Sequence, residues 1–178
     1  MFKQLMLASY CLLLIACTTT QPQQPNIAAA HDNAQLGLAY LQQGKTEYAK
    51  NKLLLALHQA PNDPLILDAM GYFLEKTGES KTANQYYLQA IKIAPHEGAV
   101  HNNYGAYLCR HGHYQTAIEH FLQAVKDKNY LNTAAAYENA GLCALKIPDK
   151  KSAKLYFQQA LNSNPTKTTA KAELAKLG

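Results

Sequence analysis

The chain repeats one frame of small and apolar residues at intervals of 34 positions. Each copy has a glycine, an alanine, a large apolar residue and a second alanine, and the fourth copy is displaced by two extra residues. The copies are Gly37, Ala49, Leu53, Ala56 and Pro61; Gly71, Ala83, Tyr87, Ala90 and Pro95; Gly105, Ala117, Phe121 and Ala124; and Gly141, Ala153, Phe157, Ala160 and Pro165. A unit this short cannot bury its own apolar face, so it must stack on neighbouring copies.

This period is typical of the tetratricopeptide repeat (TPR), a helix–turn–helix unit. It predicts an all-α fold, a right-handed α-solenoid of TPR units with a C-terminal solvating helix. The expected repeats are 30–63, 64–97, 98–131 and 134–167. The expected first helices are 30–43, 64–77, 98–111 and 134–147, and the second helices are 46–59, 80–93, 114–127 and 150–163. Residues 168–178 are expected to form the solvating helix or a truncated fifth repeat.

The mid-helix glycines of the frame indicate close helix packing, because glycine costs about 0.5–1 kcal/mol relative to alanine inside a helix. We expect the second helix of each unit to cross the first there, with the first alanine of the frame as the partner small residue. The large apolar residue is expected to fill the space between units. Gly44, Gly78 and Gly112 are expected to end first helices in the left-handed conformation.

The N-terminus has the features of a secretory signal in residues 1–16, since a mainly apolar stretch follows Lys3. Leu14-Ile15-Ala16-Cys17 resembles the bacterial lipobox, which implies acylation of Cys17. Thr18 in place of aspartate implies sorting to the outer membrane, anchored on the periplasmic face. Residues 17–29 are polar and proline-containing, which predicts a lipidated flexible tether. The alternatives are an ordinary signal peptide, or a short helix, with an incidental cysteine.

Composition argues against several classes of function. The formal net charge is +5, but the basic residues form no stripe, which argues against nucleic acid as a partner. No motif arranges a nucleophile with a base, so we expect neither an enzyme nor a cofactor or small-molecule substrate. His101, His111 and His113 lie near Cys109, but no second cysteine has the close spacing of a zinc site, so no metal is expected.

Cys109 and Cys143 are the cysteines that remain after the signal and the lipidation site. They fall near the ends of the first helices of adjacent units, and secretion implies an oxidising compartment. A disulfide requires Cα atoms within about 7 Å, which stacked helices allow. We therefore expect a Cys109–Cys143 disulfide, with two buried free thiols as the alternative.

The second, fifth, ninth and twelfth positions of each first helix are expected to line a concave wall. This wall is apolar and uncharged, with carboxylates and almost no lysine or arginine, so it differs from a basic clamp for a C-terminal carboxylate. It suits an extended or helical peptide with apolar side chains and amides. Packing within the repeats, or solvated surface, is the alternative for each residue. The candidate partner-binding residues are Leu38, Leu41, Asp68, Tyr72, Glu75, Asn102, Asn103, Glu138, Leu142 and Leu145. Asn102 and Asn103 could bind a partner's backbone or cap locally.

The run Asn102-Asn103-Tyr104-Gly105-Ala106-Tyr107-Leu108-Cys109, with the later run from Glu138 to Cys143, resembles the PilW/PilF type IV pilus lipoproteins. The lipobox and the repeat frame agree with this resemblance. It implies a pilotin, an outer-membrane lipoprotein that binds the pilus secretin and promotes its localisation and assembly. A periplasmic TPR adaptor for cell-wall enzymes is the alternative, since it could use the same lipid and repeats.

Overall fold

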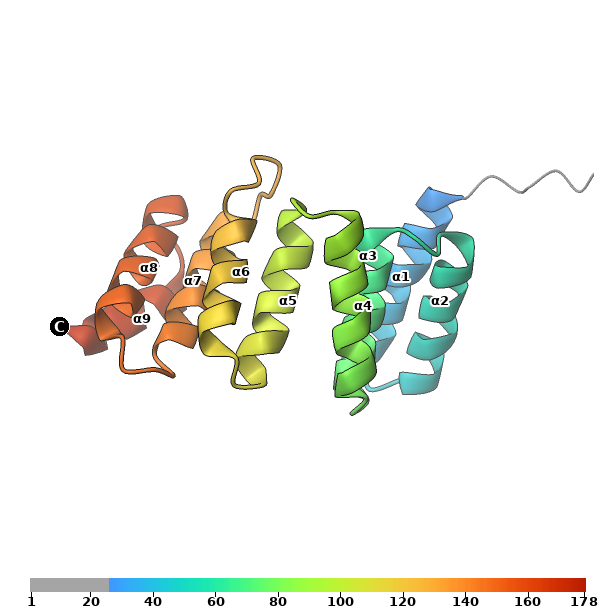
Figure 1. Ribbon diagram of the computed structural model, residues 1–178, viewed down its shortest axis with the longest axis horizontal. Coiled ribbons are helices and arrows are strands. Elements are labelled where there is room, and N and C mark those ends of the chain that lie inside the picture. Colours follow the sequence, from blue (N-terminus) through green and yellow to red (C-terminus); the bar gives the residue numbers. More distant parts are fainter. Residues whose placement is uncertain (1–25) are drawn as a thin grey trace, which may run out of the picture.

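The computed structural model describes residues 26–178. The signal peptide, Cys17 and most of the tether predicted above lie outside the described residues. Within residues 26–178 the chain forms nine helices and no strand. The helices are α1 (Ile27–Gln42), α2 (Thr46–Gln59), α3 (Pro64–Lys76), α4 (Ser80–Ile93), α5 (Gly98–Arg110), α6 (Tyr114–Ala124), α7 (Thr133–Ala144), α8 (Lys150–Ser163) and α9 (Thr168–Leu177). They stand side by side in one row, from α1 and α2 at one end to α8 and α9 at the other (Figure 1).

Consecutive helices pack in pairs, α1 on α2, α3 on α4, α5 on α6 and α7 on α8, and the pairs stack into an α-solenoid. The ranges predicted for α2, α4 and α8 are confirmed. However, α6 ends at Ala124, three residues before the predicted end at 127. Asp127 explains the early end, because its side chain accepts hydrogen bonds from the backbone N–H of Gly98 at 2.9 Å and of Asn129 at 2.8 Å. These contacts hold residues after Ala124 in a loop over the start of α5.

The mid-helix glycines are required chiefly by the large apolar residue of the second helix. A Cβ at Gly37 would lie 2.7 Å from Leu53 Cγ, and one at Gly141 would lie 2.6 Å from Phe157 Cε1. A Cβ at Gly37 would also lie 3.2 Å from the carbonyl oxygen of Ala49, and one at Gly105 would lie 3.0 Å from that of Ala117, so the second helix crosses at the frame's alanine as predicted and the large residue is a further contact. The large residue contacts the glycine of its own unit, as well as the next unit in the case of Tyr87.

The glycines at the turns within units adopt the left-handed conformation, as predicted. Gly44, Gly78 and Gly112 have φ angles of 74°, 92° and 84°. A side chain at these positions would be strained by its own Cβ, whatever the space around it. These turns fix where the first helix of each unit ends and the second begins.

The last helix, α9, packs against α8 and α7 at one end of the row. Ala170 is buried there, Leu174 is half-buried and Ala175 is exposed. No helix within residues 26–178 has the length and apolar character needed to cross a membrane.

Candidate partner-binding groove

A hollow of about 400 Å³ opens on the face formed by the first helices of the units. It receives residues from α1, α3, α5 and α7, and none from the even-numbered helices. We call this hollow the groove. Its lining residues are Leu38, Gln42, Asp68, Ala69, Tyr72, Asn102, Asn103, Ala106, Arg110 and Asn139. Five of the predicted residues therefore come together here: Leu38, Asp68, Tyr72, Asn102 and Asn103.

Side-chain hydrogen bonds cross the groove from α3 to α7. Asn103 Nδ2 donates to Asp68 Oδ2 at 2.6 Å, and Asn102 Nδ2 donates to Asn103 Oδ1 at 3.3 Å. Asn139 Nδ2 donates to Asn102 Oδ1 at 3.0 Å. We call these three asparagines the amide chain. Each asparagine has a second N–H and further acceptor capacity, so the groove retains hydrogen-bonding groups that a bound partner could use.

Asp68 is the one carboxyl among the residues joined by these hydrogen bonds, and it is only 6% exposed. Burial raises its pKa to about 7, the hydrogen bond from Asn103 acts to lower it, and the nearby Glu97 raises it. Its Oδ1 atom is buried and accepts no hydrogen bond from any residue that the structure describes. Burial of an ionised carboxylate is unfavourable without such partners, which accounts for the direction of the shift.

Arg110 is the one basic residue among those that line the groove. Its guanidinium reaches the groove and forms a bidentate pair with Glu75, with Nε–Oε1 and Nη2–Oε2 both 2.7 Å. The hydrogen bonds to Glu75 raise the pKa of Arg110 above its ordinary value. Glu75 does not line the groove, because its carboxylate is turned to Arg110 and lies 3.7 Å from His111 Nε2. The pair neutralises both charges, so Arg110 does not make the groove a basic clamp.

The remaining predicted residues do not line this hollow. Glu138 lies 3.4 Å from Lys167 Nζ, and Leu142 is 36% exposed, further along the same face. Leu41 and Leu145 are half-buried and pack against the core. For Leu41 and Leu145, contact with the core is the role that the structure describes.

Cys109 and Cys143 are joined by a disulfide, with their Cα atoms 5.9 Å apart. The bond connects the C-terminal part of α5 to that of α7. It therefore ties together two of the helices that carry the amide chain. Cys143 is fully buried, whereas Cys109 is partly exposed.

Sequence reasoning missed Asn139, although a signal for it was present. Asn139 occupies the repeat position of Asn103, once the two inserted residues are counted. Sequence reasoning also missed a histidine pair outside the groove, in which His101 is buried and His120 is half-buried. His101 Nδ1 lies 2.8 Å from His120 Nδ1, and His101 Nε2 lies 2.9 Å from the carbonyl oxygen of Pro95. Nothing in the sequence signals a contact between residues on different helices of this kind.

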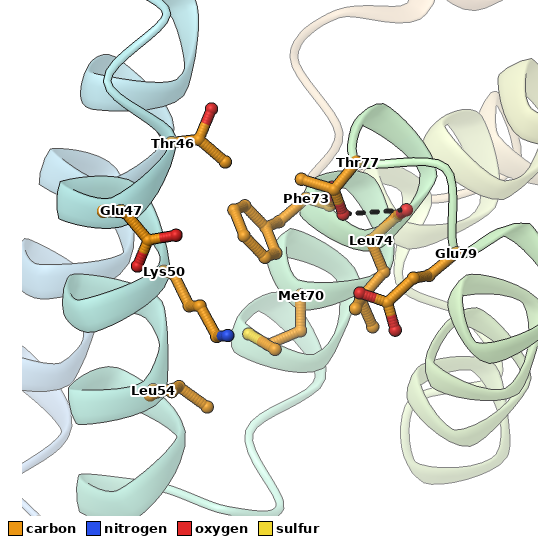
Figure 2. Close-up of a pocket in the computed structure, with 9 residues that line it drawn as sticks. All are labelled: Thr46, Glu47, Lys50, Leu54, Met70, Phe73, Leu74, Thr77 and Glu79. Carbon is orange, nitrogen blue, oxygen red and sulfur yellow. Dashed lines mark hydrogen bonds between the residues drawn. The ribbon is translucent and has the colours of Figure 1, made fainter.

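A second hollow, of about 370 Å³, lies between α2 and α3 (Figure 2). Figure 2 shows Phe73 and Met70 facing α2, with the Lys50 side chain extending toward Met70. None of the predicted site residues lines this hollow. One repeat further along, Tyr104 and Tyr107 take the positions of Met70 and Phe73 and line a similar hollow.

The two tyrosines bridge that second junction with their hydroxyl groups. Tyr104 donates to Asn84 Oδ1 at 3.0 Å, and Tyr107 donates to the carbonyl oxygen of Ser80 at 2.9 Å. Met70 and Phe73 have no hydroxyl and cannot form such bonds. Within residues 26–178, no three His, Cys, Asp or Glu side chains gather in a way that could hold a metal ion.

Comparison with known proteins identifies the repeat. Residues 66–97, 86–119 and 134–167 match models of the tetratricopeptide repeat. The chain belongs to the tetratricopeptide-repeat family. Members of this family stack helical hairpins into surfaces that mediate protein–protein interactions, and such scaffolds are typically non-catalytic. No curated protein sequence matches the chain.

Solved structures show where this tetratricopeptide-repeat protein stands within the family. PilF of Pseudomonas aeruginosa is 33% identical with a TM-score of 0.79, covering 84% of this chain and 68% of PilF. PilW, described as a widely conserved type IV pilus biogenesis factor, is 25% identical with a TM-score of 0.76, covering 83% of this chain and 68% of PilW. YrrB, a TPR protein with an unusual peptide-binding site, shares the fold at 20% identity and a TM-score of 0.64, covering 85% of this chain and 76% of YrrB. The chain thus has a PilF/PilW-like TPR fold.

Proposed function

We propose that this protein is an outer-membrane lipoprotein that binds the type IV pilus secretin through the groove and promotes its localisation and assembly. The observation that carries the proposal is the amide chain, which crosses a hollow on a PilF-like fold. The protein forms and breaks no covalent bond in this role. It acts by holding a segment of the secretin.

The lining of the groove fits an extended protein segment. The amide chain offers side-chain hydrogen-bond donors and acceptors along the groove. An extended backbone presents N–H and C=O groups in alternation, so it can pair with both kinds of group. Leu38 and Tyr72 are half-buried beside these amides and offer apolar contact to alternate side chains. Arg110 is already paired with Glu75, so a bound carboxylate would compete with that pair.

Acylation of Cys17 would hold the groove at the membrane where secretin subunits arrive. Confinement of two partners to one surface raises their effective concentration without any new contact between them. Bound secretin segments would also be shielded from pairing with one another through exposed strand edges.

A deletion strain tests the proposal. Loss of the protein should abolish heat-stable secretin multimers and surface pili, and the wild-type gene should restore both. A Tyr72→Ala/Asn102→Ala chain should fail to restore them, whereas a Leu155→Ala chain, altered on the exposed side of α8, should restore both. Normal multimers and pili in the deletion strain would refute the proposal.

Lipid attachment is tested in the same strain. A Cys17→Ser chain should leave the outer-membrane fraction and should restore fewer multimers than wild type. Affinity capture on the full chain should recover the secretin. Recovery of murein hydrolases without secretin would instead favour an adaptor for cell-wall enzymes.

A further inference from the structure

The hydrogen bonds of the amide chain all run in one direction. Asn139 donates to Asn102, Asn102 donates to Asn103, and Asn103 donates to Asp68. Asp68 ends this series, and an ionised carboxylate can only accept. The series therefore has an acceptor at its α3 end and an amide at its α7 end.

An asparagine side chain can exchange its oxygen and nitrogen by a half-turn about its terminal bond, so its orientation follows its partners. An ionised Asp68 holds the Nδ2 of Asn103 toward itself. That leaves the Oδ1 of Asn103 to accept from Asn102, and the same constraint passes from Asn102 to Asn139. An amide at position 68 could donate or accept, and would fix no direction.

We propose that Asp68 is a positioning residue that sets the direction of the amide chain, and thereby the N-to-C direction in which the groove binds an extended partner segment. The inference rests on the proposed function and names the mode of recognition at the same site. When the amide chain has a fixed donor-to-acceptor direction, it can pair fully with a backbone bound in one N-to-C direction. A backbone bound in the opposite direction leaves donors and acceptors unpaired.

The surroundings of Asp68 make its charge sensitive to small changes. Burial raises its pKa, Asn103 acts to lower it, and Glu97 at the start of α5 acts to raise it. Burial raises the pKa of Tyr87 on α4, and the charge of Asp68 raises it further. From the other helices, Gln42 of α1 is uncharged, and Arg110 of α5 is paired with Glu75. A protonated Asp68 can donate as well as accept, so protonation removes the directional constraint.

The first test needs no partner. In the full chain in detergent, side-chain amide resonances of Asn103, Asn102 and Asn139 should shift together as pH is raised through about 7, the pKa of Asp68. In an Asp68→Asn chain, which keeps the shape of the side chain, these shifts should vanish. An Asp32→Asn chain, altered at an exposed position of α1, should behave as wild type. A shift confined to Asn103, or shifts that persist in Asp68→Asn, would overturn the inference.

The second test measures binding of the purified periplasmic region of the secretin at pH 6 and pH 8. Wild-type affinity should rise with pH, and calorimetry in two buffers should detect proton release on binding. Asp68→Asn should bind about tenfold more weakly at pH 8, because a hydrogen bond to a charged group is lost, and should show no pH dependence. Equal, pH-independent binding by both chains would refute the inference and leave the proposed function standing. Failure of wild type to bind would refute the proposed function, and the amide resonances would still decide whether Asp68 directs the chain.

Discussion

Arg110 on α5 and Glu75 on α3 form a bidentate ion pair across the junction of the second and third units. The Glu75 side chain is 8% exposed and that of Arg110 is 43% exposed. The nearly buried carboxylate therefore depends on Arg110, rather than on water, to compensate its charge. Removal of one member of such a pair leaves a nearly buried charge uncompensated.

Arg110→Gln is therefore expected to lower the free energy of unfolding by about 1–2 kcal/mol, allowing for screening at the exposed guanidinium. Urea denaturation at neutral pH measures the change. The Arg110→Gln/Glu75→Gln double variant should lose less than the single variant, because it leaves no unpaired carboxylate. A double variant less stable than the single one would contradict this account.

We expect substitution of Asp68 by asparagine to increase the free energy of unfolding, and to increase it more at higher pH. Its pKa is raised from 3.8 to about 7, so the folded state binds more protons than the unfolded state between these values. Stability from this group is present at low pH and is lost as pH rises through 7. Asp68→Asn removes that loss, and should be more stable than wild type at pH 8 by up to about 4 kcal/mol. Urea unfolding at pH 5 and pH 8 measures the difference, and an equal effect at both values would argue against a shifted pKa.

The His101–His120 pair predicts the opposite pH dependence. Burial, together with His101, lowers the pKa of His120 from 6.5 to about 4. Between these values the unfolded state binds more protons, so stability is present above pH 6.5 and falls as pH drops toward 4. We expect a loss of about 1–2 kcal/mol over this window, after discounting for partial exposure of His120. Thermal unfolding at pH 7 and pH 5 measures it, and His120→Gln should show a smaller drop over the same range.

The disulfide should contribute about 3–4 kcal/mol by closing a loop between cysteines separated by 34 residues. Reduction with dithiothreitol should lower the unfolding free energy of wild type by this amount. A Cys109→Ala/Cys143→Ala chain should already lack that stabilisation and should not respond to the reductant. A response of the double variant would show that dithiothreitol acts elsewhere.

Much of the fold follows from the sequence because stacked repeats put equivalent residues in equivalent places. The 34-residue period located the helices. The end of α6 was misplaced because Asp127 binds the backbone of Gly98 on another helix, a contact that no local propensity encodes.

The groove was predictable in part for the same reason. Asn102 lies where the register of its first helix predicts an inward residue, whereas Asn103, one position further on, was a candidate only as the adjacent amide. Arg110 was missed because its long side chain reaches the groove from outside the inward positions. The direction of the amide chain required atomic positions, since the sequence does not show which oxygen meets which nitrogen.

The junctions between successive units differ in the bonds that cross them. Among the described residues, no hydrogen bond links α2 to α3, where Met70 and Phe73 make apolar contact. Tyr104 and Tyr107 bond α5 to α4 at the next junction, and a covalent bond joins α5 to α7 at the third. Apolar surfaces slide past one another more readily than bonded ones. The α2–α3 side of the first junction should therefore open more readily than the α4–α5 side of the next, whereas His31 Nε2, 2.9 Å from Asp63 Oδ2, holds α1 to the start of α3 and keeps the groove side of the first junction closed.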